Sequence, residues 1–469
     1  MGRKQDESWR DYAGRLEVEN ADLRERVATL EDMVNRLLKR VDELERAGKR
    51  QASPFSKGDP KEKPKKPGRK KGGKGGRRNP RPRPKKIDET YEVPLPDRCP
   101  DPDCDGELER QGFADQFQSE VPRVEPITRH FRLEIGSCTC CGKRVQPRHP
   151  LQTSDALGAA NHTLGANALA VGTLLNKEYG LSWKKVSRLV ETAFGLRASA
   201  STFCRATLRV GDRVEPTAGA ITAAMRESPV VSPDETGWRT GGHKRWLWTF
   251  TTPDLTVYEI APSRGFEVAA SVLGASFSGT LVRDGWAPYR KFVEADHQTC
   301  LAHLLRRCRN ILETAKQGAA RFAHSVRAVL KGALALRDRR HELTEHGFAS
   351  LRGKLKAKMD WLLSWSPTYE PNARFAKHLR AEREALFTFL YQEGVDATNG
   401  GAERAIRPAV LARKLSGGSR TDRGATVHAR MLTVLRTAKQ QGRDQLTVLV
   451  EAFLSVGPID LGLVPDPGG

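Results

Sequence analysis

Residues 229–238 read PVVSPDETGW, and this stretch begins the pattern that decides the fold. Its short apolar run ends at Asp234, and it is followed by further runs rich in β-branched and aromatic residues. These runs are WLWTFTT (246–252), TVYEIAPS (256–263) and GTLVRD (279–284). Such runs bounded by turn residues predict strands, and a helix can start near Gly265. We therefore expect three antiparallel strands, a helix and a fourth strand.

Acidic residues stand at the ends of two of these strands and in a later helix. Asp234 ends the first strand and Asp284 the fourth, whereas Asn399 can cap a short helix that carries Glu403, with a kink expected at Pro408. Sheet twist can bring the strand ends together, and converging carboxylates bind the Mg²⁺ or Mn²⁺ that offsets their repulsion. Two such ions can activate a water or a 3′-hydroxyl for phosphoryl transfer on nucleic acid. The pattern indicates a ribonuclease H-like α/β catalytic core.

Two of the three acids, Asp284 and Glu403, also have a simpler interpretation. Asp284 is typical of a turn residue, and Glu403 with Arg407 four positions later is typical of a surface ion pair. Glu235 should point to the opposite face of the strand from Asp234, so we leave it outside the catalytic set.

The charge is strongly positive and unevenly distributed. The 469 residues, enough for about three domains, hold 79 Lys and Arg against 57 Asp and Glu, a net +22 that favours nucleic acid over membrane. Residues 1–50 are neutral, residues 53–86 carry 15 basic against two acidic residues, and the rest carries +9. We expect residues 51–90 to be a disordered basic linker that binds phosphates, with Arg81 and Arg83 as candidate DNA contacts. A solubilising spacer or a localisation signal is the alternative.

Leucines recur every seven residues near the N-terminus, with valines four positions later. They are Leu16, Leu23, Leu30, Leu37 and Leu44, followed by Val27, Val34 and Val41. This heptad favours a parallel two-stranded coiled coil over residues 1–50, with Asn20 fixing the register. We expect a homodimer or a higher oligomer; the alternative is a helix that packs on its own protein.

Five of the eight cysteines cluster in one short stretch. Four of them form two short pairs, Cys99 with Cys104 and Cys138 with Cys141. This spacing is typical of structural zinc, although Cys140 is a fifth candidate and buried free thiols are the alternative. Because residues 124–135 read as a strand, we expect residues 91–150 to be a small zinc-binding β module. Cys300 and His303 are more typical of packing or of support to a site than of metal binding.

Residues 151–220 have a helical pattern. Ser182 and Ser199 can start two helices around a turn at Gly195, so this is a possible helix-turn-helix DNA-binding region. The candidate DNA-facing side chains are Arg205 and Arg209. Any small helical bundle would give the same pattern.

No segment approaches the roughly 20 apolar residues of a membrane span, and the start has no signal-peptide pattern. We expect a soluble, cytoplasmic, nucleoid-associated protein without a membrane partner.

A series of motifs resembles the insertion-sequence-66 family of DDE transposases. The motifs are DETGW (234–238), WLW (246–248), SR (263–264), DG (284–285), CLAH (300–303), NGGAERAIRPAVLARK (399–414) and SGG (416–418). The similarity is collinear over most of the chain, because the family also has a zipper, a basic linker and a cysteine-rich module. The sequence departs from the family where Gly400 replaces a second asparagine.

The resemblance implies that Asp234, Asp284 and Glu403 bind two Mg²⁺ or Mn²⁺ ions as the catalytic triad. It also implies a helical insertion at residues 317–385 between the second and third acids. The expected parts are a core at 221–316 and 386–425, the insertion, and a C-terminal helical segment and tail at 426–469. Basic side chains near Glu403 are candidate phosphate contacts, with solvated charge as the alternative: Arg404, Arg407, Arg413 and Lys414.

We therefore expect a multidomain α+β transposase with structural zinc. Its expected partners are the terminal inverted repeats, target DNA and accessory proteins of the same element. One alternative is a non-enzymatic, dimeric, zinc-containing DNA-binding regulator with a degenerate core, and another is a ribonuclease H-like RNA nuclease. Convergence of the three carboxylates within reach of a shared pair of ions favours an enzyme, and a failure to converge favours the regulator.

Overall fold

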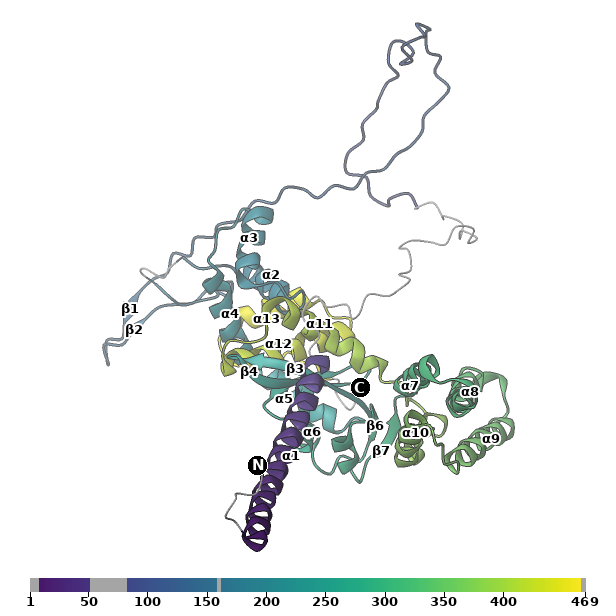
Figure 1. Ribbon diagram of the computed structural model, residues 1–469. Helices are drawn as coiled ribbons and strands as arrows, with labels where there is room; N and C mark the ends of the chain where they lie inside the picture. Colours follow the sequence, from purple (N-terminus) through teal and green to yellow (C-terminus); the bar gives the residue numbers. More distant parts are fainter. Residues whose placement is uncertain (1–7, 51–81, 158–161, 465–469) are drawn as a thin grey trace. The chain divides into compact units, whose positions relative to one another are not determined.

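A computed structural model describes residues 8–50, 82–157 and 162–464 (Figure 1). Arg81 and most of the expected basic linker lie outside the described residues. The chain divides into two compact units, Met1–Val121 and Pro122–Gly469. The described residues form thirteen α-helices and a mixed five-stranded sheet, which confirms the α+β class.

The first unit contains the helix α1 (Trp9–Arg50), where the heptad pattern predicts a helix. Apolar heptad positions along it are about half exposed: Leu23, Val27, Leu30, Val34 and Leu37. This stripe is therefore not covered by other described residues.

The sheet has the strand order β5-β4-β3-β6-β7. Its strands are β3 (Val230–Thr240), β4 (His243–Thr251), β5 (Thr256–Ala261), β6 (Thr280–Arg283) and β7 (Asp296–Thr299), with α6 (Phe266–Leu273) between β5 and β6. β3, β4 and β5 are antiparallel, whereas β6 is parallel to both β3 and β7. The predicted order of three antiparallel strands, a helix and a strand is thus confirmed, and β7 is an addition.

The two faces of the sheet contact different helices. Trp248 and Phe250 belong to the main core with α5 (Glu215–Arg226) and α6, whereas Leu247 and Tyr258 pack with α11 (Gly400–Ser416) and α12 (Asp422–Gln440). Side chains alternate between faces along a strand, so Asp234 and the adjacent Glu235 point to opposite sides. In the register, Asp234 pairs with Thr249 and Glu235 with Trp248.

Four helices precede the sheet in Pro122–Gly469. They are α2 (Ala166–Lys177), α3 (Trp183–Phe194), α4 (Ala200–Arg213) and α5. The predicted boundaries of α3 and α4 are confirmed: Ser182 and Ser199 accept hydrogen bonds from N–H groups of the first turns, and Gly195 ends α3 with a left-handed φ of 64°. A helix can end this way at glycine because it lacks a Cβ.

Four further helices follow β7 and cluster beyond that edge of the sheet (Figure 1). They are α7 (Leu301–Thr314), α8 (Ala320–Asp338), α9 (Glu345–Leu363) and α10 (Glu370–Ala381). They share a core that includes Leu304, Val326, Leu362 and Phe375. The helical content expected for residues 317–385 is confirmed.

Several local predictions are wrong. Asp234 does not end the first strand, because β3 continues beyond it to Thr240. The helix that carries Glu403 is not short, because α11 runs for 17 residues and contains Pro408 within it. Residues 124–135 form no strand; the described part of the cysteine-rich segment contains only β1 (Gly136–Ser137) and β2 (Arg144–Val145). Val124 and Ile127 are 50% and 79% exposed, so that apolar run has neither a partner strand nor a core to cover it.

The chain ends with α12 and α13 (Gln445–Leu454), which pack back on the sheet and on α2. None of the helices in the described part of the chain is long and apolar enough to cross a membrane.

Candidate functional site

The three predicted acids come from three elements of Pro122–Gly469. Asp234 lies within β3, and Asp284 directly follows β6, the parallel neighbour of β3. Glu403 lies in the first turn of α11, the helix that packs on β3 and β4. The topology therefore draws together residues that are up to 169 positions apart.

The pKa of Asp234 responds to the charges of the other two acids. Burial raises its pKa, the charges of Glu235, Asp284 and Glu403 raise it further, and the net pKa is about 7. One hydrogen bond opposes this, since the Asp234 Oδ1 accepts from the Glu235 N–H at 2.9 Å. A carboxyl surrounded by burial and negative charge favours a proton or a cation.

The carboxylates do not yet enclose an ion. Among the described residues, no three His, Cys, Asp or Glu side chains lie close enough together to hold a metal. The Asp284 Oδ1 accepts a hydrogen bond from the Trp286 N–H at 2.9 Å, and the Glu403 side chain is 43% exposed. Binding a shared ion therefore requires the acidic side chains to move closer together, and the oxygen donors fit Mg²⁺ or Mn²⁺ chemically.

Asn399 connects the elements that carry two of the acids. It occupies the N-cap position of α11, but its side chain does not cap the helix, contrary to the prediction. Its Nδ2 donates instead to the Pro233 carbonyl at 2.7 Å, and its backbone N–H donates to the Cys300 Sγ at 3.2 Å. Its buried Oδ1 has no hydrogen-bond partner among the described residues. A buried acceptor beside Asp234 and Glu403 is suited to an additional polar group at this site.

His303 lies beside Glu403, which the sequence pattern did not reveal. The His303 Nε2 is 3.9 Å from the Glu403 Oε1. The Cys300 side chain raises the pKa of His303, burial lowers it, and Asp284 also raises it, with a net increase. Cys300 is buried just before α7. The buried Cys300 and the half-buried His303 thus pack next to the Glu403 carboxylate.

Glu235 forms a separate, fully paired site on the opposite face of the sheet. Its side chain is 1% exposed and accepts from Arg264, including the Arg264 Nε at 2.8 Å, and from the Tyr289 hydroxyl at 2.5 Å. Burial raises the pKa of Glu235, whereas Tyr289 and Arg264 lower it, and burial dominates. Leaving Glu235 outside the triad therefore agrees with its contacts.

The Arg264 guanidinium, which binds Glu235, also packs against the turn that carries Asp284. It lies over the rings of Trp286 and Trp246, at 3.8 and 4.9 Å from their centroids. The Trp286 indole N–H donates to the Arg264 carbonyl at 3.3 Å, and the Trp286 backbone N–H donates to Asp284. One stacked group thereby fixes the turn after β6 against β3.

A buried ion cluster fixes the same turn from the other side. Arg283, next to Asp284, donates to the Glu382 Oε2 at 2.7 Å, and the two side chains are 2% and 0% exposed. Arg290 and Thr299 also donate to Glu382. Glu382 directly follows α10, so this cluster anchors the helices of residues 317–385 to the strand that presents Asp284. None of these partners could be recognised from local sequence.

The predicted DNA-binding residues differ in exposure. Those that are exposed are Arg83, Arg205, Arg209, Arg404, Arg407 and Lys414. Arg413 differs from this group: it is half-buried and donates to the Thr236 hydroxyl at 3.0 Å and to the Gly237 carbonyl. The guanidinium of Arg413 is therefore engaged in holding α11 on β3.

The predicted zinc ligands lie in two turns, one in each unit. In Met1–Val121, the Cys104 N–H donates to the Asp101 carbonyl at 3.0 Å. In Pro122–Gly469, the Gly142 N–H donates to the Cys138 carbonyl at 2.9 Å, and Gly142 has the positive φ (67°) that this tight turn needs. The backbone N–H of Cys141 lowers the pKa of Cys138.

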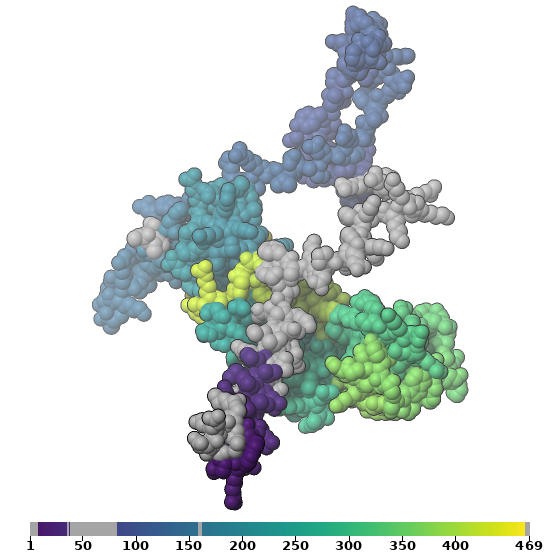
Figure 2. All heavy atoms as spheres, viewed as in Figure 1, coloured from purple at the N-terminus to yellow at the C-terminus, as the bar shows by residue number. Residues whose placement is uncertain are grey.

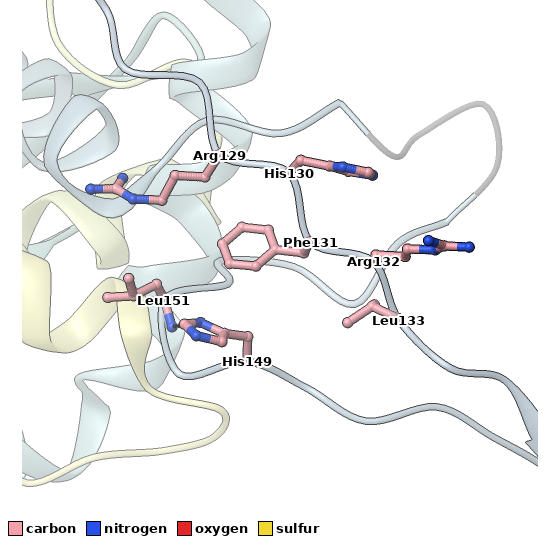
Figure 3. A pocket seen from close by; sticks show the side chains of 7 residues that line it. All are labelled: Arg129, His130, Phe131, Arg132, Leu133, His149 and Leu151. Atoms are coloured by element: carbon pink, nitrogen blue, oxygen red, sulfur yellow. Dashed lines mark hydrogen bonds between the residues drawn. The ribbon is translucent and has the colours of Figure 1, made fainter.

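A hollow of about 460 Å³ is lined by none of the three acids (Figure 3). Arg129, Phe131 and His149 are among its lining residues, and the Phe131 and His149 rings are 5.1 Å apart. It has no acidic lining residue, so it offers no carboxylate ligands for a metal.

Comparisons with known proteins agree with the resemblance seen in the sequence. A family model described as "Transposase IS66 family" matches residues 163–427, a span that includes all three acids. The chain is also 26% identical over 298 residues to a protein of Sinorhizobium fredii (strain NBRC 101917 / NGR234) named "Uncharacterized protein y4qI". The match covers 56% of this chain and 54% of that protein, so the chain spans about half the length of this curated relative.

Proposed function

The chain belongs to the IS66 family of transposases, and from this premise we propose that it cleaves the ends of its DNA element and joins them to target DNA. The observation that carries the proposal is the half-buried Asp234 carboxyl, whose pKa is raised by burial and by Glu235, Asp284 and Glu403. The strand order β5-β4-β3-β6-β7 supports a ribonuclease H-like core.

In this proposal Asp234 and Asp284 hold divalent ions, and Glu403 completes the site. A pair of Mg²⁺ or Mn²⁺ ions supplies nucleophile activation and stabilises the leaving oxygen. In the first step a water oxygen bonds to phosphorus and the bond to the 3′-oxygen breaks, which leaves a 3′-hydroxyl and a 5′-phosphate. In the second step the oxygen of that 3′-hydroxyl bonds to a target phosphorus, the target's own bond from phosphorus to its 3′-oxygen breaks, and the released 3′-oxygen takes up a proton. No covalent protein–DNA intermediate is required.

Neighbouring residues hold the elements that carry the three acids in place. Asn399 holds the start of α11 near Pro233, and His303 lies against the Glu403 carboxylate. Arg264 and the Arg283–Glu382 cluster hold the turn that carries Asp284. Exposed basic residues on α11, Arg404, Arg407 and Lys414, lie on the helix that starts at the site and are suited to phosphate contacts.

The remaining proposals concern assembly. The exposed heptad stripe of α1 is suited to a parallel dimer, and the two cysteine turns to structural zinc. Terminal inverted repeats and target DNA are the proposed partners, together with accessory proteins of the same element, and the proposed location is the nucleoid. Zinc analysis of the purified protein and of Cys138→Ser tests the metal: zinc should fall in the variant.

The central test is cleavage and strand transfer on DNA ends of the element with Mg²⁺. Asp234→Asn, Asp284→Asn and Glu403→Gln should each lower the cleavage rate at least about a thousandfold while DNA binding stays within a few fold. Glu267→Gln, a change of an exposed hydrogen-bonded carboxylate on α6, is the matched control and should retain activity. Full activity in the three site variants overturns the proposal. Cleavage of RNA but not of DNA by the wild type would indicate a ribonuclease.

A further inference from the structure

The helices between β7 and α11 carry most of the net positive charge found after the basic linker. Residues 317–385 hold 14 Lys and Arg against seven Asp and Glu, a net +7. The chain after residue 86 carries only +9 in total, so nearly all of that surplus lies in this one segment. Figure 2 shows the segment in green, standing out beside the sheet. A local surplus of this size attracts a polyanion.

The outward side of α9 carries two of these lysines beside two apolar side chains. Leu351, Lys354, Lys358 and Trp361 are all exposed, and their spacing of three, four and three residues places them on one face of the helix. Neither lysine has an acidic partner within 4.0 Å among the described residues. Asp360 lies on the opposite side of α9, where Arg383 donates to both of its oxygens at 2.7 and 2.8 Å. The charged side chains of this face are therefore both basic.

An aromatic side chain stands at the end of this face in a fixed position. Trp361 is 54% exposed, and its ring contacts Trp365 edge to face at a centroid distance of 4.7 Å. Arg321 of α8 lies over the Trp365 ring at 5.4 Å. An exposed indole that is held by a second indole, next to unpaired lysines, is suited to sugar or base contacts beside a phosphate chain.

The position of α9 relative to Asp284 is fixed by buried contacts. α9 packs on α8 and α10, and Figure 1 shows it on the side of the helical cluster away from the sheet. Glu382, just after α10, is joined to Arg283 at 2.7 Å, next to Asp284. A DNA segment held on α9 would therefore be held at a set distance from the proposed cleavage site.

We propose that the α9 face, defined as Leu351, Lys354, Lys358 and Trp361, binds the DNA that extends beyond the cleaved phosphodiester. The lysines contact backbone phosphates, and Trp361 packs on a sugar or an unpaired base. This inference rests on the proposed function, because it assigns to one helix a part of the DNA path that the acidic site requires.

The test measures binding of the full-length protein to fluorescein-labelled duplexes that end in the same element terminus and carry a short or a long flank. Lys354→Gln and Lys358→Gln should each weaken binding to the long-flank duplex about five- to tenfold near 0.1 M salt and reduce the slope of log K against log salt by about 0.9. Lys377→Gln, which removes an exposed lysine from α10, is the matched control and should bind like the wild type. All three variants should bind the short-flank duplex as tightly as the wild type does.

Trp361→Ala tests the aromatic contact separately, because this change leaves the charge of the α9 face unaltered. It should weaken binding at least about fivefold on a duplex with a single-stranded flank, with an unchanged salt slope. A helical circular dichroism spectrum equal to wild type establishes that each variant is folded. Long-flank binding by the lysine variants that equals wild type, while wild type cleaves its DNA ends, overturns this inference alone. A wild type that binds no DNA overturns it together with the proposed function.

Discussion

Replacing Asp234 by asparagine should stabilise the protein above neutral pH, because the native carboxylate is held in an unfavourable environment. Burial and three neighbouring acids raise its pKa from 3.8 to about 7. Below about pH 4 the carboxyl is protonated in both the folded and the unfolded protein, so it has no effect on the pH dependence. Between about pH 4 and 7 the unfolded chain loses the proton that the folded protein keeps, and stability falls as pH rises.

The magnitude follows from this difference in pKa. At 1.36 kcal/mol for each tenfold change in the proton affinity, the full penalty is about 4 kcal/mol. Because the residue is only partly buried in the fold, solvent screening reduces the expected effect to about 2 kcal/mol. Asp234→Asn removes this penalty, so its free energy of unfolding should exceed that of wild type by about 2 kcal/mol at pH 8 and equal it near pH 4.

Urea denaturation of both proteins at pH 4, 6 and 8 measures this difference. Asp254→Asn, in an exposed turn between β4 and β5, is the control and should leave the pH dependence unchanged. Mn²⁺ at about a hundred times its Kd should add about 2.7 kcal/mol to the wild type at pH 8 and much less to Asp234→Asn. The reasoning is refuted if Asp234→Asn is destabilised at pH 8, or if its difference from wild type is the same at pH 4 and pH 8.

Three further predictions concern two contacts around the acidic site and the N-terminal zipper. Glu382→Gln leaves Arg283 buried without its carboxylate and should lower the free energy of unfolding by about 3 kcal/mol in urea denaturation. Glu313→Gln, in an exposed pair with Arg309, is the control and should lower it by less than about 0.5 kcal/mol. Equal losses in the two variants would contradict the buried cluster. Arg264→Lys cannot reproduce the forked contact and the stacking between two indoles, so it should lower stability by about 2 kcal/mol, and an unchanged urea midpoint would count against that contact. Leu30→Lys should raise the dimer dissociation constant at least about a hundredfold in analytical ultracentrifugation; an unaltered dimer would exclude the zipper.

The sheet and the helices that precede it could be predicted from sequence where the signal is local. The strands around Asp234 and Asp284 follow from short apolar runs that end in an acid, and the starts of α3 and α4 follow from Ser182 and Ser199 as caps. These features depend on a few adjacent residues, so a single sequence carries them. The strand expected at 124–135 does not form, because an apolar run needs a partner strand that the run itself does not specify.

The supporting contacts could not be predicted because their partners are distant in the chain. The Asn399 side chain binds a carbonyl 166 residues away, and Glu382 pairs with an arginine 99 residues away. Asn399 looked like a helix cap because position and residue type both fit, yet the Pro233 carbonyl takes its amide. Only the folded chain shows which of two acceptable partners such a side chain contacts.

A change of metal preference at residue 284 tests the central claim most directly. A thiolate binds Mn²⁺ more readily than Mg²⁺, so Asp284→Cys should alter which ion supports DNA cleavage if this side chain is a metal ligand. The account predicts that Asp284→Cys is inactive on the element's DNA ends with Mg²⁺ and regains measurable cleavage with Mn²⁺, whereas Asp284→Ala stays inactive with both. Equal cleavage by wild type and Asp284→Ala with either ion would contradict it.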